Sequence, residues 1–161
     1  PNEFKISAGY ALSQRYNDLL SHSDGFVENS IIQQITDINF EAKKIDTQID
    51  KTPSNASFTK KVITNLNRLT KSFEIQQADA ILELFDIINK LELQIDISEA
   101  QNVYYNKIYH RIDTIIDKIE NNPKEKDLKF INLLLDIGKN LNINIDFYKV
   151  KIDKLNMALK D

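Results

Sequence analysis

Two histidines and three pairs of carboxylates are the side chains whose types and spacing could support catalysis or metal binding. His22 lies in an expected turn and His110 on an expected long helix, and no nucleophile can be identified beside either of them. A histidine titrates close to neutral pH and can serve as a general base, but that role needs a partner group within reach. The sequence therefore favours a structural role for both histidines.

Carboxylates four residues apart occur three times, and such pairs face the same side of a helix. They could share a proton or a divalent cation. A solvated charged face gives the same spacing, and no Glu-x-x-His motif accompanies the pairs, as a metal site in a helical bundle would require. We therefore predict no catalytic, cofactor-binding or metal-ligating residue, and expect solvated faces at Asp37/Glu41, Asp79/Glu83 and Asp113/Asp117.

One group of residues does suggest a ligand or an interface, because two amides and two aromatic rings crowd into one helical turn. These residues are Gln101, Asn102, Tyr104 and Tyr105. Amides can hydrogen-bond the hydroxyls of a carbohydrate, and an aromatic face can stack on the apolar face of a sugar ring. The same side chains can serve structure, with Gln101 capping its helix, Tyr104 burying its ring and Asn102 bonding a connector. The structural interpretation is favoured, and the ligand interpretation stays open.

Composition bounds the class of protein. The chain has 161 residues, the size of one ordinary domain, and a chain of this length can bury a core without disulfides or metals. Its 42% hydrophobic and 28% charged residues are typical of globular proteins, and three Gly with three Pro are too few for a turn-rich β fold. The net charge is -3, and basic residues are dispersed among acids, so we expect no nucleic-acid partner. No apolar run is long enough to cross a bilayer, so we expect no membrane partner.

The absence of cysteine excludes disulfides, thiolate nucleophiles and Cys-based zinc sites. It fits a reducing compartment, and we expect a cytoplasmic protein. The N-terminal stretch PNEFKISAGYAL has neither the basic region nor the apolar core of a signal peptide, and it has no initiator Met. We therefore expect a processed chain or an excerpt of a longer protein.

The hydrophobic pattern predicts an all-α fold, because apolar residues recur at three- and four-residue steps. Strict alternation occurs only in stretches too short to be more than extended connectors, such as Leu91 to Asp96. Turn-forming residues at 21–25, 52–55 and 121–123 interrupt the helical pattern. Seven helices are expected, at about 3–21, 27–45, 58–73, 78–91, 98–119, 128–141 and 150–159.

An internal repeat gives these helices an order. Residues 84–97 read LFDIINKLELQIDI and residues 134–147 read LLDIGKNLNINIDF, with the shared core Leu-x-x-x-Ile-Asp at an offset of 50 and a weaker copy at 45–50. Each copy ends one helix, crosses a connector and begins another, which places an acidic residue where the next helix offers free N–H groups. The predicted structural caps are Asp50, Asp96 and Asp146, together with Ser98 in a capping box with Gln101.

The expected architecture is one helical domain over 1–161, with three αα-hairpins and the N-terminal helix as an additional packing element. A repeat of this length is typical of a short solenoid of stacked helical pairs. A compact bundle whose hairpins share one style of connector gives the same pattern, and both arrangements stay open.

The sequence AQNVYY at 100–105, preceded by Leu-x-Leu-x-Ile-Asp, resembles the helical C-terminal region of glycoside hydrolase family 57-type proteins. FKISAGYALSQRYNDLL at 4–20 is similar to the start of that region, which is catalogued as a domain of unknown function after the catalytic domain. The resemblance covers most of the chain, but only the AQNVYY piece is specific. It implies that the catalytic carboxylates belong to the preceding domain, and no position here matches them.

Two functions are therefore expected from the sequence. The leading one is a non-catalytic accessory domain of a carbohydrate-active protein, with the parent catalytic domain as its partner and a carbohydrate as a further ligand. It predicts an exposed apolar patch for docking. The alternative is an independent helical scaffold that binds a protein in a groove between hairpins. A helical enzyme with a carboxylate site is the third and least favoured interpretation.

Overall fold

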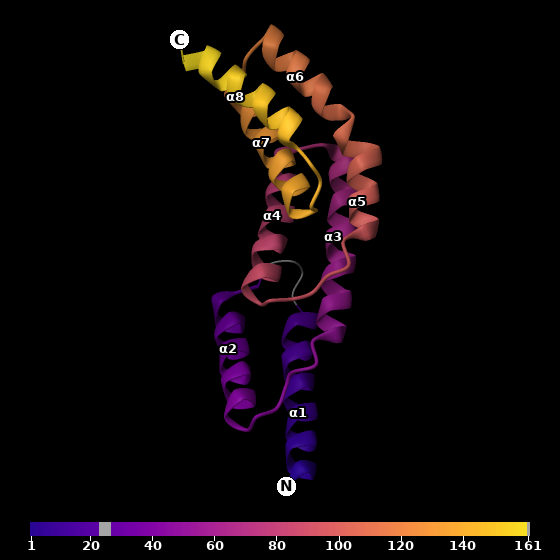
Figure 1. Cartoon of the computed structure of the whole chain (residues 1–161), viewed down its shortest axis with the longest axis vertical. Helices are drawn as coiled ribbons and strands as arrows, with labels where there is room; N and C mark the ends of the chain where they lie inside the picture. Colours follow the sequence, from indigo (N-terminus) through magenta and orange to yellow (C-terminus); the bar gives the residue numbers. More distant parts are fainter. Residues whose placement is uncertain (23–26, 161) are drawn as a thin grey trace. The chain divides into compact units, whose positions relative to one another are not determined.

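The computed structural model describes residues 1–22 and 27–160, and these residues form helices joined by short connectors (Figure 1). No strand occurs within these ranges, so the predicted all-α fold is confirmed. Part of the predicted turn at 21–25 lies outside the described residues. The elements are α1 Asn2–Ser21, α2 Asn29–Lys44, α3 Thr52–Ser72, α4 Ile75–Lys90, α5 Ser98–Tyr104, the π-helix η1 Tyr105–Tyr109, α6 Arg111–Asn121, α7 Glu125–Asn140 and α8 Asp146–Lys160.

The residues gather into two compact units, and each is described by itself. Unit 1 comprises Pro1–Lys61 and Asp86–Asp96, and unit 2 comprises Val62–Phe85 and Ile97–Asp161. In unit 1, α1 packs beside α2, and in unit 2, α6, α7 and α8 pack on one another (Figure 1). Because α1 already pairs with α2, the helix left outside the three hairpins is α8 and not the N-terminal helix that was expected there. The expectation of a single domain stays a prediction. Within the described ranges, no helix combines the length and apolar content needed to cross a membrane.

The helices that lead the hairpins repeat every 46 residues. We call α1, α3 and the stretch from α5 to α6 the leading helices, and α2, α4 and α7 the return helices. Each leading helix buries the same stripe of side chains, at Leu12/Phe58/Tyr104, Tyr16/Val62/Ile108 and Leu20/Leu66/Ile112. The spacing of 50 found between the last two return helices arises because α6 continues almost one turn further than the equivalent part of α3.

The three return helices end in the same way. Asp46, Glu92 and Asn142 have φ values of 54°, 53° and 56°, in the left-handed region that usually favours glycine. In each case the next residue donates its N–H to the carbonyl five residues back, and the three N···O distances are all 2.9 Å. This Schellman motif turns the chain out of the helix and into an extended connector. The predicted extended connectors at the three Ile-Asp copies are therefore confirmed.

Side chains of the leading helices hold these connectors in place. The Asp50 N–H donates to Ser13 Oγ at 2.8 Å, and the Asp96 N–H donates to Thr59 Oγ1 at 3.1 Å. Ser13 and Thr59 are equivalent positions of the repeat, since 59 − 13 = 46. A hydroxyl at this position satisfies a connector N–H that has no partner within a helix, as buried backbone groups require.

The predicted caps have different outcomes. Asp50 does cap α3, because its Oδ1 accepts from Thr52 N–H at 3.0 Å, and these bonds lower the pKa of its carboxyl. Asp146 does place a carboxylate in the first turn of α8, as expected, but the capping bond comes from Asn144, whose Oδ1 accepts from Asp146 N–H at 3.0 Å. The third connector is shorter, so the cap falls two residues earlier. The capping roles of Asp96 and Ser98 stay predictions.

The start of α3 also differs from the expected position near Phe58. The helix begins at Thr52 and includes Pro53 in its first turn. Proline is tolerated there because the first N–H groups of a helix have no intrahelical acceptor. The Thr-Pro-Ser-Asn run that was interpreted as a break is therefore the first turn of the helix.

Candidate functional site

The four residues predicted as a ligand site do not form one surface. Tyr104 is fully buried, and its hydroxyl donates to Leu134 O at 2.7 Å. Burial raises the pKa of Tyr104 above its ordinary value. The prediction that this ring stacks on a ligand is wrong, because none of the ring is accessible. Its structural interpretation, a buried ring whose hydroxyl finds a partner, is confirmed.

The other three residues have separate surroundings. Gln101 Nε2 donates to Leu141 O at the end of α7, at 2.7 Å, which ties α5 to the return helix. This tertiary role was not predicted, since Gln101 was expected to serve its own helix. Asn102 is exposed, and Tyr105 is 51% exposed. Only Asn102 and Tyr105 therefore remain available to a ligand.

Tyr105 belongs to an aromatic cluster built on η1. Its ring stacks on that of Tyr109, with centroids 4.9 Å apart and planes 7° from parallel, and Tyr109 meets Tyr148 edge to face at 5.1 Å. Tyr148 Oη donates to Asp113 at 2.9 Å, and burial together with this bond raises the pKa of Tyr148 to about 12. The rings chiefly fasten α8 to η1, which leaves the outer ring of Tyr105 as a flat exposed surface.

Several of the carboxylates and one of the histidines considered for catalysis contact structural neighbours. Glu41 pairs with Arg15 at 3.5 Å, and the other carboxylate of its pair accepts from Gln33. Asp113 accepts from Tyr148, as described above, and His110 lies edge to face with Tyr109 at 6.1 Å. Within residues 1–22 and 27–160, no three His, Cys, Asp or Glu side chains lie close enough to hold a metal ion.

A cleft between α1 and the first connector is lined by an aromatic ring and amides, the kinds of side chain that the sequence interpretation expected at residues 101–105. We call it the connector groove, and its volume is about 490 Å³. It combines an exposed aromatic ring with amides and carboxylates, the groups that recognise polar ligands. Its lining residues are Ile6, Gly9, Tyr10, Ser13, Gln14, Asn17, Asp18, Thr47, Gln48, Asp50 and Pro53.

Asn17 holds the walls of the connector groove together. Its Nδ2 donates to Asp50 O at 2.8 Å, and its Oδ1 accepts from both the N–H and the hydroxyl of Ser54, at 3.2 and 2.6 Å. Gly9 leaves room for the Thr47 side chain in its present orientation, because a methyl group there would lie 2.5 Å from Thr47 Oγ1. These contacts fix the groove without involving a ligand.

The ligand-facing groups of the connector groove are different residues. Tyr10 is 73% exposed, and Gln14, Gln48 and Asp18 are exposed beside it. A second cleft of about 640 Å³ shares Gln48 and Asp50 with the connector groove and adds further amides at Asn55 and Gln94. Both clefts lie in unit 1. An extended polar ligand could therefore contact several amides and one aromatic face.

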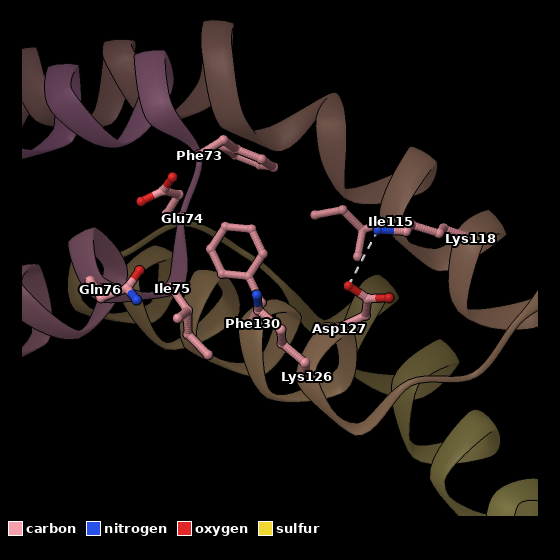
Figure 2. A pocket seen from close by; sticks show the side chains of 9 residues that line it. All are labelled: Phe73, Glu74, Ile75, Gln76, Ile115, Lys118, Lys126, Asp127 and Phe130. Atoms are coloured by element: carbon pink, nitrogen blue, oxygen red, sulfur yellow. Dashed lines mark hydrogen bonds and ion pairs between the residues drawn. The ribbon is translucent and has the colours of Figure 1, made fainter.

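A third hollow, of about 400 Å³, lies in unit 2 between the α3–α4 turn, α6 and α7 (Figure 2). Phe73 and Phe130 meet edge to face across it at 5.0 Å, and the Arg111 guanidinium lies 3.4 Å from the Phe73 ring centroid. Phe73 has a φ of 51°, so these contacts hold a backbone conformation that is rare outside glycine. Lys118 and Asp127 form an ion pair at 3.5 Å at one end of the hollow. Its walls are mixed, since two phenylalanines and two isoleucines alternate with charged and amide side chains.

A shallow apolar groove lies on another flank of α1. We call it the α1–α2 groove, and it is lined by Phe4, Ala8, Ala11, Leu12, Glu41, Lys44 and Ile45. Phe4 is 63% exposed, and Phe40 on α2 is exposed to the same degree. Exposed aromatic side chains on a folded domain often mark a docking surface. The accessory-domain interpretation of the sequence expected an exposed apolar patch but assigned it to no particular helix.

Comparison with known proteins identifies no relative, since no family model, curated protein or solved structure matches this chain.

Proposed function

We propose that this chain is a non-catalytic helical scaffold that binds carbohydrate in the connector groove, as an accessory domain of a carbohydrate-active protein. The observation that carries the proposal is Tyr10, whose ring is 73% exposed in the wall of a cleft that also presents Gln14 and Gln48. Amides can donate to and accept from sugar hydroxyls at once, and an aromatic face covers the apolar face of a pyranose ring.

Two further features support this assignment. Asn17 and Asp50 fix the groove through hydrogen bonds within the protein, so little ordering is needed when a ligand binds. The resemblance of 4–20 and 100–105 to the helical region of glycoside hydrolase family 57-type proteins favours the same ligand class. The specific residues of that resemblance, Gln101 and Tyr104, serve packing here, so the proposed sugar contacts move to α1 and the first connector.

Isothermal titration calorimetry with maltohexaose tests the proposal. We expect heat of binding for the unaltered chain, and loss of that heat in Tyr10→Ala because the stacking surface is removed. Tyr105→Ala is the matched control, since it also removes an exposed helical tyrosine but lies in the other unit. Equal loss in both variants would contradict the groove, and no heat with the unaltered chain would contradict carbohydrate binding.

A second function, protein binding, is favoured by the exposed apolar side chains of α1 and α2. Phe4, Ile6 and Tyr10 are 63–73% exposed, and three large apolar side chains exposed on one helix are typical of a surface that a partner covers. The sequence interpretation named the parent catalytic domain as this partner. Light scattering of the chain mixed with a family 57-type catalytic domain tests that expectation. A particle with the summed mass supports it, and two unchanged masses would argue against it.

A further inference from the structure

The residues that α1 contributes to the connector groove depart from the repeat. Ile6, Tyr10 and Gln14 follow one another at four-residue steps along α1 and line the groove. The equivalent residues of the other two leading helices are all exposed and are either polar or small. They are Thr52, Ala56, Lys60, Ser98, Asn102 and Asn106. The packing of the repeat therefore does not explain the apolar chain of Ile6 or the ring of Tyr10.

The two connectors of unit 1 present the same kind of side chain to solvent. In the first connector, Gln48 and Asp50 are exposed, and the residues on either side of Gln48 are half-buried. Gln94 and Asp96 lie 46 residues later, at the equivalent positions of the second connector, and are also exposed. This alternation is that of an extended chain, whose successive side chains point to opposite sides. Each connector therefore offers one amide to solvent at the same point of the repeat.

These two amides connect the two clefts of unit 1. Gln48 and Gln94 both line the second cleft, and Gln48 also lines the connector groove, so the two hollows adjoin at Gln48. Asn55 Oδ1 accepts from the Gln94 N–H at 2.9 Å, which fixes the backbone of the second connector beside the start of α3. The Gln94 side chain takes no part in that bond. A ligand that covers Tyr10 and extends past Gln48 therefore meets Gln94 next.

The charges along the two clefts select against acidic ligands. The carboxylates of Asp18, Asp50 and Glu92 line them. Among the described residues that line either cleft, the only cation is Lys51, and its Nζ already donates to Leu91 O at 3.1 Å. Carboxylates are ionised at neutral pH and repel anions, so both clefts favour a ligand without carboxyl or sulfate groups.

We infer that the connector groove and the second cleft together bind a linear, uncharged glycan, which crosses the two connectors and contacts one amide on each. The hydroxyl groups that recur along such a chain match amides that recur along the repeat, since a side-chain amide both donates and accepts. Repeat proteins present extended binding surfaces in the same way, from equivalent positions of successive repeats. This inference rests on the carbohydrate-binding function proposed above and adds the class of glycan.

Calorimetry with two lengths of the same sugar tests this inference. We expect maltohexaose to bind the unaltered chain about tenfold more tightly than maltotriose, because only the longer sugar reaches both amides. Gln94→Ala should weaken the binding of maltohexaose about fivefold and leave that of maltotriose unchanged, since it removes one amide but keeps the N–H that holds the connector. Gln34→Ala is the matched control, because Gln34 is an exposed glutamine of α2 that lines neither cleft. Circular dichroism confirms that each variant is folded.

The outcomes distinguish this inference from the function on which it rests. Equal affinities for the two sugars, or an unchanged affinity of Gln94→Ala for maltohexaose, would overturn the binding of one glycan across both connectors. Loss of heat in Tyr10→Ala would then still support carbohydrate binding in the connector groove alone. A hexamer of galacturonic acid tests the charge: we expect no heat, and binding as tight as that of maltohexaose would contradict an uncharged ligand. No heat with any of the three sugars would overturn both the inference and the proposed function.

Discussion

Gly138→Ala is a substitution whose outcome depends on one close approach in the tertiary structure. A methyl group at Gly138 of α7 would lie 2.7 Å from Tyr104 Oη and 2.9 Å from Ile145 Cγ2. Both neighbours belong to the core of unit 2, and Tyr104 is held by its bond to Leu134 O. Neither can move aside without displacing other side chains. The variant must therefore either shift the tyrosine ring or strain α7.

The magnitude follows from three contributions. Replacing glycine by alanine inside a helix stabilises it by about 1 kcal/mol. Overpacking a core costs about 1–3 kcal/mol, and weakening the Tyr104–Leu134 hydrogen bond costs about 1 kcal/mol more. We therefore expect Gly138→Ala to lower the free energy of unfolding by about 1–3 kcal/mol. Urea unfolding followed by circular dichroism measures this change.

Gly9→Ala is the matched control, since Gly9 is the other glycine that lies inside a described helix. The added methyl group would meet only the side chain of Thr47, whose Oγ1 would lie 2.5 Å away and whose Cβ and Cγ2 would lie 3.6 and 3.7 Å away. Thr47 is half-buried on a connector, so its side chain can turn aside without displacing the core. We expect its stability to stay within about 1 kcal/mol of the unaltered chain. The double variant Gly138→Ala/Tyr104→Phe should recover part of the lost free energy of unfolding, because it lacks Tyr104 Oη, the atom nearest to the added methyl group. Equal effects of the two glycine substitutions, or no coupling in the double variant, would refute the close approach as the cause.

Three further predictions concern polar contacts. Asn17→Ala should lower the free energy of unfolding by about 1–3 kcal/mol in urea titrations, because Ser54 and the first connector lose a shared partner, and an unchanged midpoint would mean that the network is dispensable. Tyr104→Phe should cost about 1 kcal/mol in the same assay through loss of its single hydrogen bond, and a larger loss would point to repacking. The free energy of unfolding should fall as the pH rises from 10.0 toward 12. Folding raises the pKa of Tyr16 and of Tyr148 from 10.0 to about 12, so in this range the unfolded chain loses the two phenolic protons while the folded chain keeps them. Tyr148→Phe should reduce this dependence, and an equally steep loss in that variant would show that other groups cause it.

The helices and their connectors could be predicted from the sequence, because burial of one face leaves a regular pattern of apolar residues. The Ile-Asp copies located all three connectors. The 46-residue period of the leading helices was missed, since Leu12, Phe58 and Tyr104 share a buried position but not a residue type. A search for equivalent hydrophobic positions, rather than for identical letters, would have found it.

The candidate sites were less predictable for a physical reason. Gln101 and Tyr104 attracted a ligand interpretation by their residue types, but burial and distant carbonyl groups decide what those side chains do. Asn17 and Gln48 are 31 residues apart, and only the folding of the first connector against α1 brings them to one groove. No local pattern signals such a meeting.

The sequence by itself determined the all-α secondary structure of this protein and the positions of its connectors, because hydrophobic periodicity and helix-ending residues act over a few neighbouring positions. It did not determine which helices pair, since α1 packs beside α2 and was expected to stand outside the hairpins. Only the tertiary structure decided which polar residues are occupied by packing and which remain available. Asp50 caps a helix as expected, whereas Asn144 replaces Asp146 because the third connector is shorter. Exposure is a property of what lies across from a residue, so Tyr10 and Tyr104, which look alike in the sequence, end at the surface and in the core.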